Sequence, residues 1–408
     1  MTTQATSGAP AARQAPPLGA RVLLTLGLVL LSSMVAQSFG RFTWPVLQPA
    51  VVEDLLGSLT RAGSLASISL TAYFLGAALV SWLSTRVDPT VLVKFGLVGS
   101  FAGLVLLTTA NGFAQLGVGL FVAGLGSAGV WVPAPGIAAA MVGPERGGFA
   151  IGLVGSGIGL GIFVVGPLTN LVRRSAGEGA WRPVYLIEAA VAAVVLALVL
   201  AAVRRPAAAA GAPIERVKVS VLREVPGWGY LLAAFAAFGA GYSLFFYFFV
   251  TQLQDAGWRP SSTNLVSSLL GASSVFGGIV FGRVSDRYGR PYTMLTGFVI
   301  MAAAPLLALT AALGPVLVAA VGYGLCVAGT PTAIGAVVAD HLRGRAFGAA
   351  FGSLTLVFSA AQLAGPQLAG IIADRTGSFV PAFAASSLLA LVGAACAFAL
   401  ARRGPRPA

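Results

Sequence analysis

Residues 282–290 read GRVSDRYGR and contain four charged side chains, Arg283, Asp286, Arg287 and Arg290. The chain on either side is apolar: SSLLGASSVFGGIVF precedes the stretch and TMLTGFVIMAAAPLLAL closely follows it. A helix of about 20 apolar residues crosses the ~30 Å hydrocarbon core of a bilayer. The pattern therefore predicts two membrane-spanning helices joined by a short charged turn.

Composition extends this prediction to the whole chain. Hydrophobic residues make up 57% and charged residues 9% of the 408 residues, and the mean hydropathy is +0.90. Soluble proteins carry roughly 25% charged residues. The apolar runs are continuous, which favours helices over a barrel, because backbone groups in lipid must be bonded within their own segment. About twelve runs are long enough to span a bilayer, at residues 22–50, 62–84, 90–110, 113–141, 148–171, 183–204, 227–252, 262–283, 291–312, 315–340, 346–373 and 378–401.

The net charge of +13 is unevenly distributed. With the N-terminus placed in the cytoplasm, most of the 25 Lys and Arg residues fall in cytoplasmic segments, as the positive-inside rule expects. Clusters such as Arg204 with Arg205 and Arg402 with Arg403 then set the topology and contact anionic lipid head groups. We expect no nucleic-acid partner and a multi-pass protein of the bacterial inner membrane, with both termini cytoplasmic.

A charged stretch rich in alanine and proline, RRPAAAAGAPIERVKVSVLREVPGW, separates the sixth apolar run from the seventh. We expect a disordered cytoplasmic tail at 1–20, an N-terminal six-helix bundle at 21–204, a cytoplasmic linker at 205–226, a C-terminal six-helix bundle at 227–401 and a short cytoplasmic tail at 402–408. At an offset of about 200 residues, GAALVSWLSTRVD in the first half aligns with GGIVFGRVSDRYG in the second. The halves look like parallel copies.

GRVSDRYGR, the repeats and the six-plus-six division together resemble the major facilitator superfamily, over nearly the whole chain after residue 20. The resemblance implies an all-α integral membrane protein of twelve helices in two pseudo-symmetric six-helix bundles. It also implies secondary transport of a small molecule by alternating access, and we expect a monomer. The nine residues match the superfamily's cytoplasmic loop signature, which implies a conformational latch.

The physics of the predicted latch can be read from its residues. Gly282 would let two helices approach closely, and Gly289 would permit a tight reversal. Asp286, Arg287 and Arg290 can make charge-assisted bonds across helix ends. In the first-half copy, SWLSTRVDP, the aspartate and the first glycine are replaced, so a weaker latch is expected there.

Arg41 lies in the first apolar run, within FGRFTWPVLQP, where a charge is costly. At 100° per residue it shares a helix face with Ser33, Gln37, Trp44 and Gln48. One interpretation is that this polar stripe lines a central cavity. The alternative is that Arg41 extends to the outer lipid head groups. The repeat offset places Tyr242 opposite Arg41 in the seventh run.

The first run also resembles that of bacterial relatives of the monocarboxylate transporters, which carry a basic residue in the outer half of the first helix. The resemblance implies that Arg41 binds a substrate carboxylate, for which a guanidinium offers a two-pronged contact. Those transporters generally carry an Asp and an Arg in the eighth helix, and SSLLGASSVFGGIVF has neither. We therefore expect a small monocarboxylate or an amphipathic anion, and efflux of hydrophobic drugs or metabolites is the alternative.

The remaining candidates are polar or aromatic residues near the middle of runs. For each one alone, helix packing is the competing interpretation. Glu188, in the sixth run, is the weak candidate for proton coupling. One histidine and two isolated cysteines offer no metal or catalytic cluster, so we expect no enzyme and no cofactor. The predicted substrate-binding residues are Arg41, Gln37, Trp44, Tyr73, Trp131, Tyr242, Phe246 and Gln362.

Overall fold

The structure, a computed structural model, describes residues 19–84, 86–142, 147–203, 219–342 and 344–403. Within these ranges every regular element is helical. The first half contains α1 (Ala20–Ser33), the π-helices η1 (Met34–Phe42) and η2 (Val52–Leu56) on either side of α2 (Trp44–Val51), and α3 (Leu59–Leu83), α4 (Pro89–Thr108), α5 (Phe113–Trp131), α6 (Ala134–Val142), α7 (Gly147–Ala176) and α8 (Arg182–Ala202). The second half contains the 3-10 helix η5 (Val219–Glu224), α9 (Trp228–Phe246), α10 (Phe249–Asp255), α11 (Pro260–Tyr288), α12 (Arg290–Leu309), α13 (Leu313–His341), α14 (Gly344–Ala361), α15 (Gly365–Thr376) and α16 (Val380–Arg403).

Twelve stretches among the described residues are helical, long and apolar enough to cross a membrane. This number confirms the prediction of an all-α membrane protein. Large apolar side chains such as Phe95, Leu171 and Leu388 are 71%, 64% and 64% exposed on the helix surfaces. Apolar surface on this scale needs an apolar surrounding, because water would be an unfavourable neighbour for it.

Four of the predicted runs contain more than one helix. The first run is divided into α1, η1 and α2 and is continued by η2, the fourth run is divided into α5 and α6, the seventh into α9 and α10, and the eleventh into α14 and α15. Pro133 lies between α5 and α6, and Pro366 is the second residue of α15. Proline lacks a backbone N–H and clashes with the preceding turn, which interrupts a helix. Hydrophobicity alone did not reveal these interruptions.

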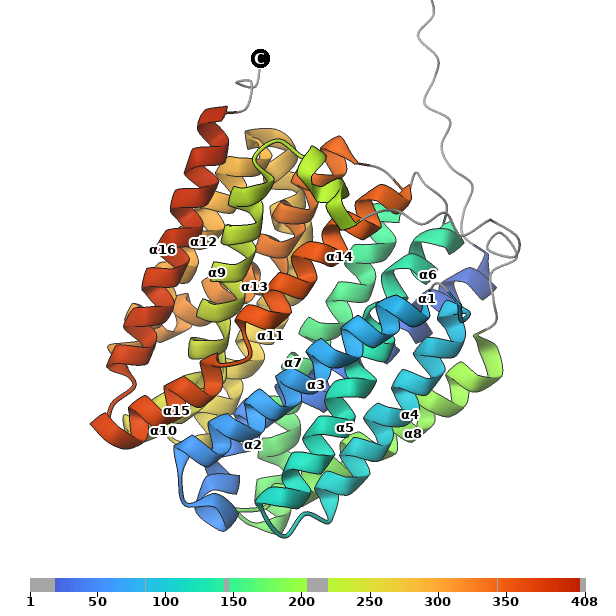
Figure 1. The fold of residues 1–408 in the computed structure, drawn as a ribbon. Coiled ribbons are helices and arrows are strands. Elements are labelled where there is room, and N and C mark those ends of the chain that lie inside the picture. The colour runs from blue at the N-terminus through green and yellow to red at the C-terminus, as the bar shows by residue number, and fades with distance from the viewer. Residues whose placement is uncertain (1–18, 85, 143–146, 204–218, 343, 404–408) are drawn as a thin grey trace, which may run out of the picture.

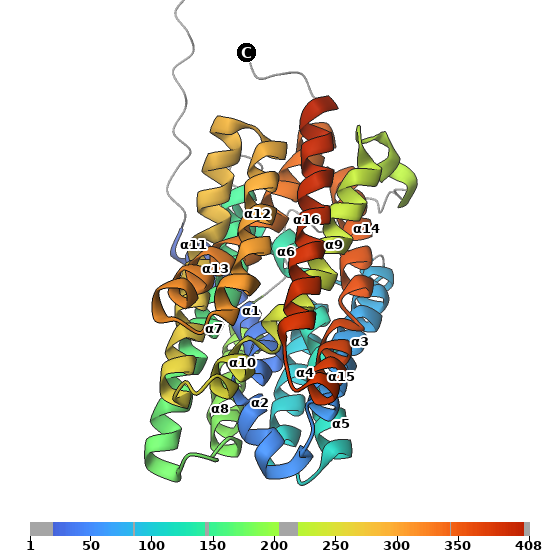
Figure 2. The same ribbon diagram turned by 90° about the vertical axis from the view of Figure 1, so that its left-hand side faces the viewer.

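The helices form two groups, α1–α8 and α9–α16, which lie side by side (Figure 1). The groups meet where α3 packs along α15 and where α7 packs along α11 (Figures 1 and 2). In the order of the spans, these are the second with the eleventh and the fifth with the eighth. The sequence repeat interchanges the two pairs, so the two junctions are equivalent, as the predicted pseudo-symmetry requires.

We name the two ends of the molecule by their connections. The linker end is the end at which α8 finishes and η5 begins, and it also carries the turn from α11 to α12. The distal end is the opposite end, where η2 is followed by α3 and α15 by α16. Residues 1–18, 204–218 and 404–408, which make up most of the predicted tails and linker, lie outside the described residues.

Candidate functional site

Arg41 is buried in the interior of the protein, with only 5% of its surface exposed. Its Nη1 donates to the Oε1 of Gln37 over 3.1 Å. The guanidinium carbon lies 4.2 Å from the centroid of the Tyr73 ring and 5.5 Å from that of Phe42. Arg41 Nε has no hydrogen-bond partner among the described residues. The side chain is therefore held by an amide and two aromatic rings, and its Nε–H remains unpaired among the described residues.

The backbone around Arg41 is π-helical. The N–H of Thr43 donates to the carbonyl of Ser38, five residues earlier, over 2.9 Å. A π-helix has more residues per turn than an α-helix and is often found at functional sites. The regular stripe expected at 100° per residue is therefore wrong across this segment. Gln48, placed on that stripe, donates to Thr251 of α10 over 3.4 Å.

Helix α9 of the other group supplies aromatic neighbours. The ring of Phe42 lies 5.2 Å from Phe246 and 6.4 Å from Tyr242, both edge to face, and Tyr242 stacks on Phe246 at 5.1 Å. The predicted residues Tyr242 and Phe246 thus come together with the turn that carries Arg41. Edge-to-face and offset contacts at these separations are favourable. The site therefore lies where η1 meets α9.

Two buried tyrosine hydroxyls lie close to the Arg41 charge, and neither makes a hydrogen bond of normal length and angle to a described residue. They belong to Tyr242, which was predicted, and Tyr247, which was not. Tyr247 is 1% exposed and follows α9 at its last turn. The interruption between α9 and α10 brings Tyr247 to the site, and a run of aromatic residues such as SLFFYFF gives no sign of it. Unsatisfied buried hydroxyls are costly, so these groups are available to a ligand.

The other predicted residues are less closely joined to Arg41. Trp131 packs against a small cluster of Tyr73, Ala77 and Ala128. Trp44 is 1% exposed, and its indole N–H has no partner among the described residues. Gln362 lies in the interruption between α14 and α15, fully buried, and both polar atoms of its amide lack described partners. No contact described here joins Trp44 or Gln362 to Arg41.

Glu188 of α8 is fully buried on the other side of the π-helical segment. Its Oε1 accepts a short hydrogen bond of 2.6 Å from the hydroxyl of Thr43, and its Oε2 has no partner among the described residues. Thr43 is two residues from Arg41, so one segment contacts both the buried cation and the buried acid. The candidate for proton coupling is thus buried beside the segment that carries Arg41.

The charged turn of the predicted latch lies at the linker end. Arg290 binds Asp286 and also Asp340 of α13, the latter with 3.2 Å between Nε and Oδ2. Gly289 has φ of 93°, which confirms the tight reversal. The close approach expected at Gly282 is wrong for this structure, because a Cβ there would meet nothing within 4 Å. Arg287 lies 5.5 Å from the Tyr288 ring and makes no ion pair among the described residues.

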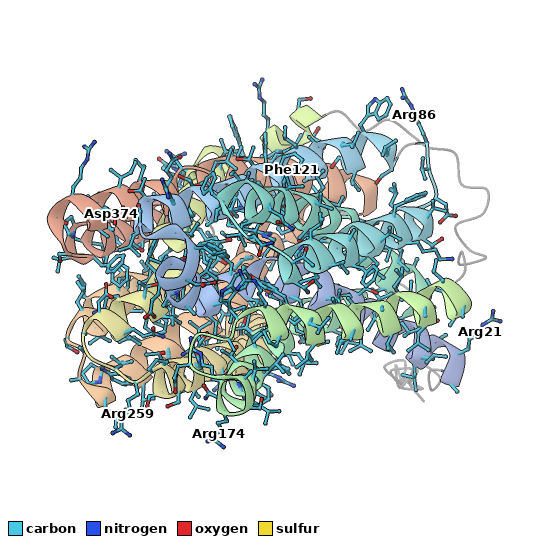
Figure 3. All side chains as sticks on the ribbon, turned by 90° about the horizontal axis from the view of Figure 1, so that it is seen from below. Arg21, Arg86, Phe121, Arg174, Arg259 and Asp374 are labelled. Atoms are coloured by element: carbon cyan, nitrogen blue, oxygen red, sulfur yellow. The ribbon has the colours of Figure 1, made fainter. Side chains whose placement is uncertain are left out.

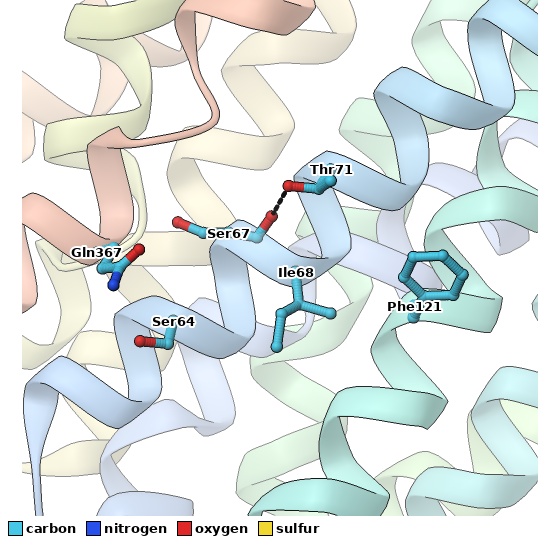
Figure 4. A pocket seen from close by; sticks show the side chains of 6 residues that line it. All are labelled: Ser64, Ser67, Ile68, Thr71, Phe121 and Gln367. Atoms are coloured by element: carbon cyan, nitrogen blue, oxygen red, sulfur yellow. Dashed lines mark hydrogen bonds between the residues drawn. The ribbon is translucent and has the colours of Figure 1, made fainter.

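A cavity of about 270 Å³ lies elsewhere, between α3, α5 and α15. Figure 4 shows Gln367 of α15 facing the polar residues of α3, with Phe121 on the other side. None of the predicted substrate-binding residues lines this cavity, so it adds nothing to the site around Arg41. The cavity is lined by Ser64, Ser67, Ile68, Thr71, Phe121 and Gln367.

No group of His, Cys, Asp or Glu in the described part of the chain could hold a metal ion.

Comparison with known proteins gives consistent matches along the chain. Residues 33–398 match the family model described as "Uncharacterised MFS-type transporter YbfB". The chain is 27% identical to monocarboxylate transporter 13 of Rattus norvegicus over 82% of its own length and 78% of that protein. It is also 27% identical to a chloramphenicol resistance protein of Streptomyces lividans, over 90% of its own length and 94% of that protein.

A similar solved structure is that of a bacterial homolog of the human lysosomal transporter Spinster, in an inward-facing and unoccupied conformation. It superimposes with a TM-score of 0.69 over 94% of this chain and 97% of the other, at 18% identity. At this identity the match concerns the fold alone. The arrangement of two helical groups is thus one that a transporter of solved structure also adopts.

Proposed function

The chain belongs to the MFS-type transporter family, and from that premise we propose that it moves a small organic anion, a monocarboxylate, across the membrane by alternating access. Membership of this family implies a small-molecule substrate and a protein embedded in a bilayer. Arg41 binds the carboxylate between the two helical groups, which rock about this point as a monomer. We put the linker end in the cytoplasm of a bacterial cell, and the excess of Lys and Arg in the segments at that end supports this orientation.

The observation that carries the proposal is the incomplete pairing of buried Arg41. A charged side chain within a membrane span costs at least ~2.5 kcal/mol and usually faces a partner or a cavity. Gln37 occupies Nη1, and the face of Tyr73 offsets part of the charge. Arg41 Nε is left over. A carboxylate pairs with a guanidinium through two parallel N–H donors on one edge of the group, and one of the edges that offers such a pair includes Nε.

The surroundings of Arg41 favour an anion of single charge with an apolar body. Among the described residues, Arg41 is the one cation in contact with Gln37, Phe42 and Tyr73. The hydroxyls of Tyr242 and Tyr247 can donate to further carboxylate or keto oxygens. Phe42 and Phe246 supply aromatic faces. The relative named monocarboxylate transporter 13 supports the same class of substrate.

The test is ligand-induced thermal stabilisation of the purified full-length protein, because a ligand that binds the folded state raises its apparent stability by mass action. The panel contains acetate, lactate, benzoate, succinate, a methyl ester of benzoate and a lipophilic cation. We expect monocarboxylates to stabilise the parent. Arg41→Gln should weaken their binding about 100-fold or more, because it removes one partner of a buried charged pair.

The matched control is Arg173→Gln. Arg173 is also nearly buried, at 8% exposure, and its Nε also lacks a described partner, but it lies in α7 and pairs with Glu178 over 3.8 Å. Arg173→Gln should leave carboxylate binding unchanged. Equal loss of binding in both variants, or stabilisation of parent and Arg41→Gln alike by the ester or the cation, would contradict the role of Arg41.

Proton coupling is the finer part of the proposal, and Glu188 is its candidate. An ionised carboxylate that is fully buried with one bare oxygen is costly, so a proton on Oε2 would stabilise this arrangement. Thr43 links Glu188 to the segment of Arg41. In proteoliposomes, Glu188→Gln should retain exchange of labelled substrate but lose accumulation driven by a pH gradient. Accumulation at the parent level would remove Glu188 from the mechanism.

Efflux of hydrophobic compounds is the second candidate function. Rings of α9 continue the aromatic surface beyond Tyr242: Phe235 and Phe238 lie 5.0 and 5.5 Å from Phe358 of α14. A surface of this kind would accept an uncharged aromatic body, and a relative is named as a chloramphenicol resistance protein. The ester in the panel separates the two functions. Stabilisation by the ester that is independent of Arg41 favours efflux.

A further inference from the structure

Asp374, near the end of α15, binds the beginning of α3. Its Oδ2 accepts from the Ser58 hydroxyl over 2.7 Å and from the Thr60 N–H over 2.8 Å, and its Oδ1 accepts from the Leu59 N–H over 3.1 Å. Figure 3, seen from the distal end, shows Asp374 where the two ribbons meet. One carboxylate therefore uses both oxygens on three donors that belong to the other group of helices.

The position of these donors explains the interaction. The first N–H groups of a helix have no partner within the helix, and the N-terminus carries partial positive charge. A side chain of the same segment usually caps them, and Ser58 does so weakly, since its hydroxyl accepts from the Arg61 N–H at 3.4 Å. Asp374 supplies the stronger, ionised acceptor. The N-terminal cap of α3 thus comes from the opposite helical group.

Close backbone packing holds Asp374 at this distance. A Cβ added to Gly63 would lie 2.2 Å from the carbonyl oxygen of Pro366, and one added to Gly370 would lie 2.3 Å from that of Leu59. These distances are far inside van der Waals contact, so α3 and α15 touch along their backbones. Asp374 is one turn beyond Gly370. Any rocking that separates the groups at the distal end must therefore break the bonds of Asp374.

We propose that Asp374 and the α3 N-terminus form a distal clasp that stabilises the conformation closed at the distal end. The proposal rests on the rocking motion of this transporter family, but it depends neither on a carboxylate substrate nor on Arg41. The carboxylate of Asp374 is exposed, so solvent and salt weaken its interaction with the helix N-terminus. The clasp therefore shifts the equilibrium between the two conformations without locking either one. Loss of the clasp increases the population of the conformation open at the distal end.

The experiment measures access to a buried cysteine from the distal side. In the full-length protein, Cys326 and Cys396 are replaced by alanine, and Thr251→Cys supplies a reporter in α10 at a position that is 3% exposed. A membrane-impermeant maleimide is added on the side of the membrane that bears Asp374. Asp374→Ala should raise the labelling rate about five-fold, as expected for an anion at a helix N-terminus. Asp374→Asn, which keeps one acceptor oxygen, should fall between.

Glu178→Ala is the matched control. Glu178 is an exposed carboxylate at the same end, but it pairs with Arg173 inside the first group of helices. Its removal should leave the labelling rate unchanged. A melting temperature measured for each variant checks that the fold persists, because general loss of stability would lower the melting temperature and could itself raise the labelling rate.

A double-mutant cycle completes the test. Ser58→Ala removes one of the three donors and should raise the labelling rate about two-fold in the parent, but not in the Asp374→Ala background. The proposal is overturned if Asp374→Ala labels at the parent rate or raises it no more than Glu178→Ala does. A full, independent effect of Ser58→Ala in the Asp374→Ala protein would also overturn it. Carboxylate stabilisation of the same variants reports separately on the proposed function.

Discussion

The two ends of the molecule use carboxylates in opposite ways. At the linker end, Asp286 and Asp340 both bind Arg290, and all three belong to α11, α12 and α13 of one helical group. At the distal end, Asp374 binds backbone donors of the other group. The first cluster resembles a known signature and lies within one body. The second spans the junction at which the two bodies must separate.

The difference decides which cluster responds to rocking. Contacts within one helical group keep their lengths when that group turns as a body, so the Arg290 cluster is maintained in either conformation. Contacts between the groups must change with the motion, and we expect this of the contacts of Asp374. A ligand or a mutation shifts a conformational equilibrium only by its differential effect on the two states. The distal end should therefore control the equilibrium, and the linker-end cluster should mainly stabilise its own group.

The largest effect on labelling from the distal side is expected for Gly63→Ala. A Cβ at this position would collide with backbone atoms of α15, which cannot move aside as a flexible side chain can. The distal end is therefore expected not to close. In the reporter protein with Thr251→Cys, labelling from the distal side should rise roughly ten-fold or more. Transport should fall by a similar factor, because the cycle requires closure.

Gly282→Ala is the control from the linker end. It introduces the same methyl group into a span of the same protein, where nothing lies within 4 Å. Labelling and transport should stay within about two-fold of the parent, since surface changes of this kind are nearly neutral. A larger effect of Gly282→Ala than of Gly63→Ala would reverse the comparison between the two ends.

The fold could be predicted from sequence because membrane-spanning helices leave a strong signal. Continuous apolar runs predicted twelve spans, and the charged linker with the repeat predicted two groups. The interruption of the eleventh run could not be predicted from hydrophobicity, because the three residues at the break, Gln362–Ala364, are uncharged and do not interrupt the apolar run. The π-helical turn around Arg41 was also missed, because a regular 100° per residue was assumed along the whole first run.

The candidate site was predicted in part. Arg41, Tyr73, Tyr242 and Phe246 are charged or aromatic, and they do come together. Tyr247 was missed because the helix break that turns it toward Arg41 is invisible in an aromatic run. Asp374 was missed for a different reason: its partners are backbone N–H groups, which every residue except proline possesses. The recurrence of Asp-Arg-x-Gly at 374–377 is visible, but its partner is not.

An intermediate effect is expected for Asn170→Ala, at the junction equivalent to that of α3 and α15. Asn170 of α7 donates to the Ser261 carbonyl over 3.0 Å and accepts from Asn264 over 2.8 Å, both in α11. The variant loses two bonds between the groups and leaves the fully buried Asn264 amide without this partner. Distal labelling should rise about three-fold.

Gln115→Ala is the control for this prediction. Gln115 makes a similar pair of bonds at the distal end, to Thr109 and to the N–H of Asn111, but inside the first group. It should leave the labelling rate at the parent value. If both variants raise labelling equally, loss of local stability rather than separation of the groups is the cause.

The smallest effect on distal labelling is expected for Arg290→Gln, although it removes the centre of the most conspicuous charge cluster. The variant leaves Asp286 and Asp340 without their common partner, so the melting temperature should fall by about 2 °C, the scale of an exposed ion-pair network. Arg287→Gln, in the same turn, should lower it less, because Arg287 makes no ion pair among the described residues. Both should leave distal labelling within about two-fold of the parent.

A several-fold rise for Arg290→Gln alone would mean that the linker-end cluster acts as a latch after all, through a change in the packing of α11 against α7. The distal clasp would then be one of two controls on the same equilibrium.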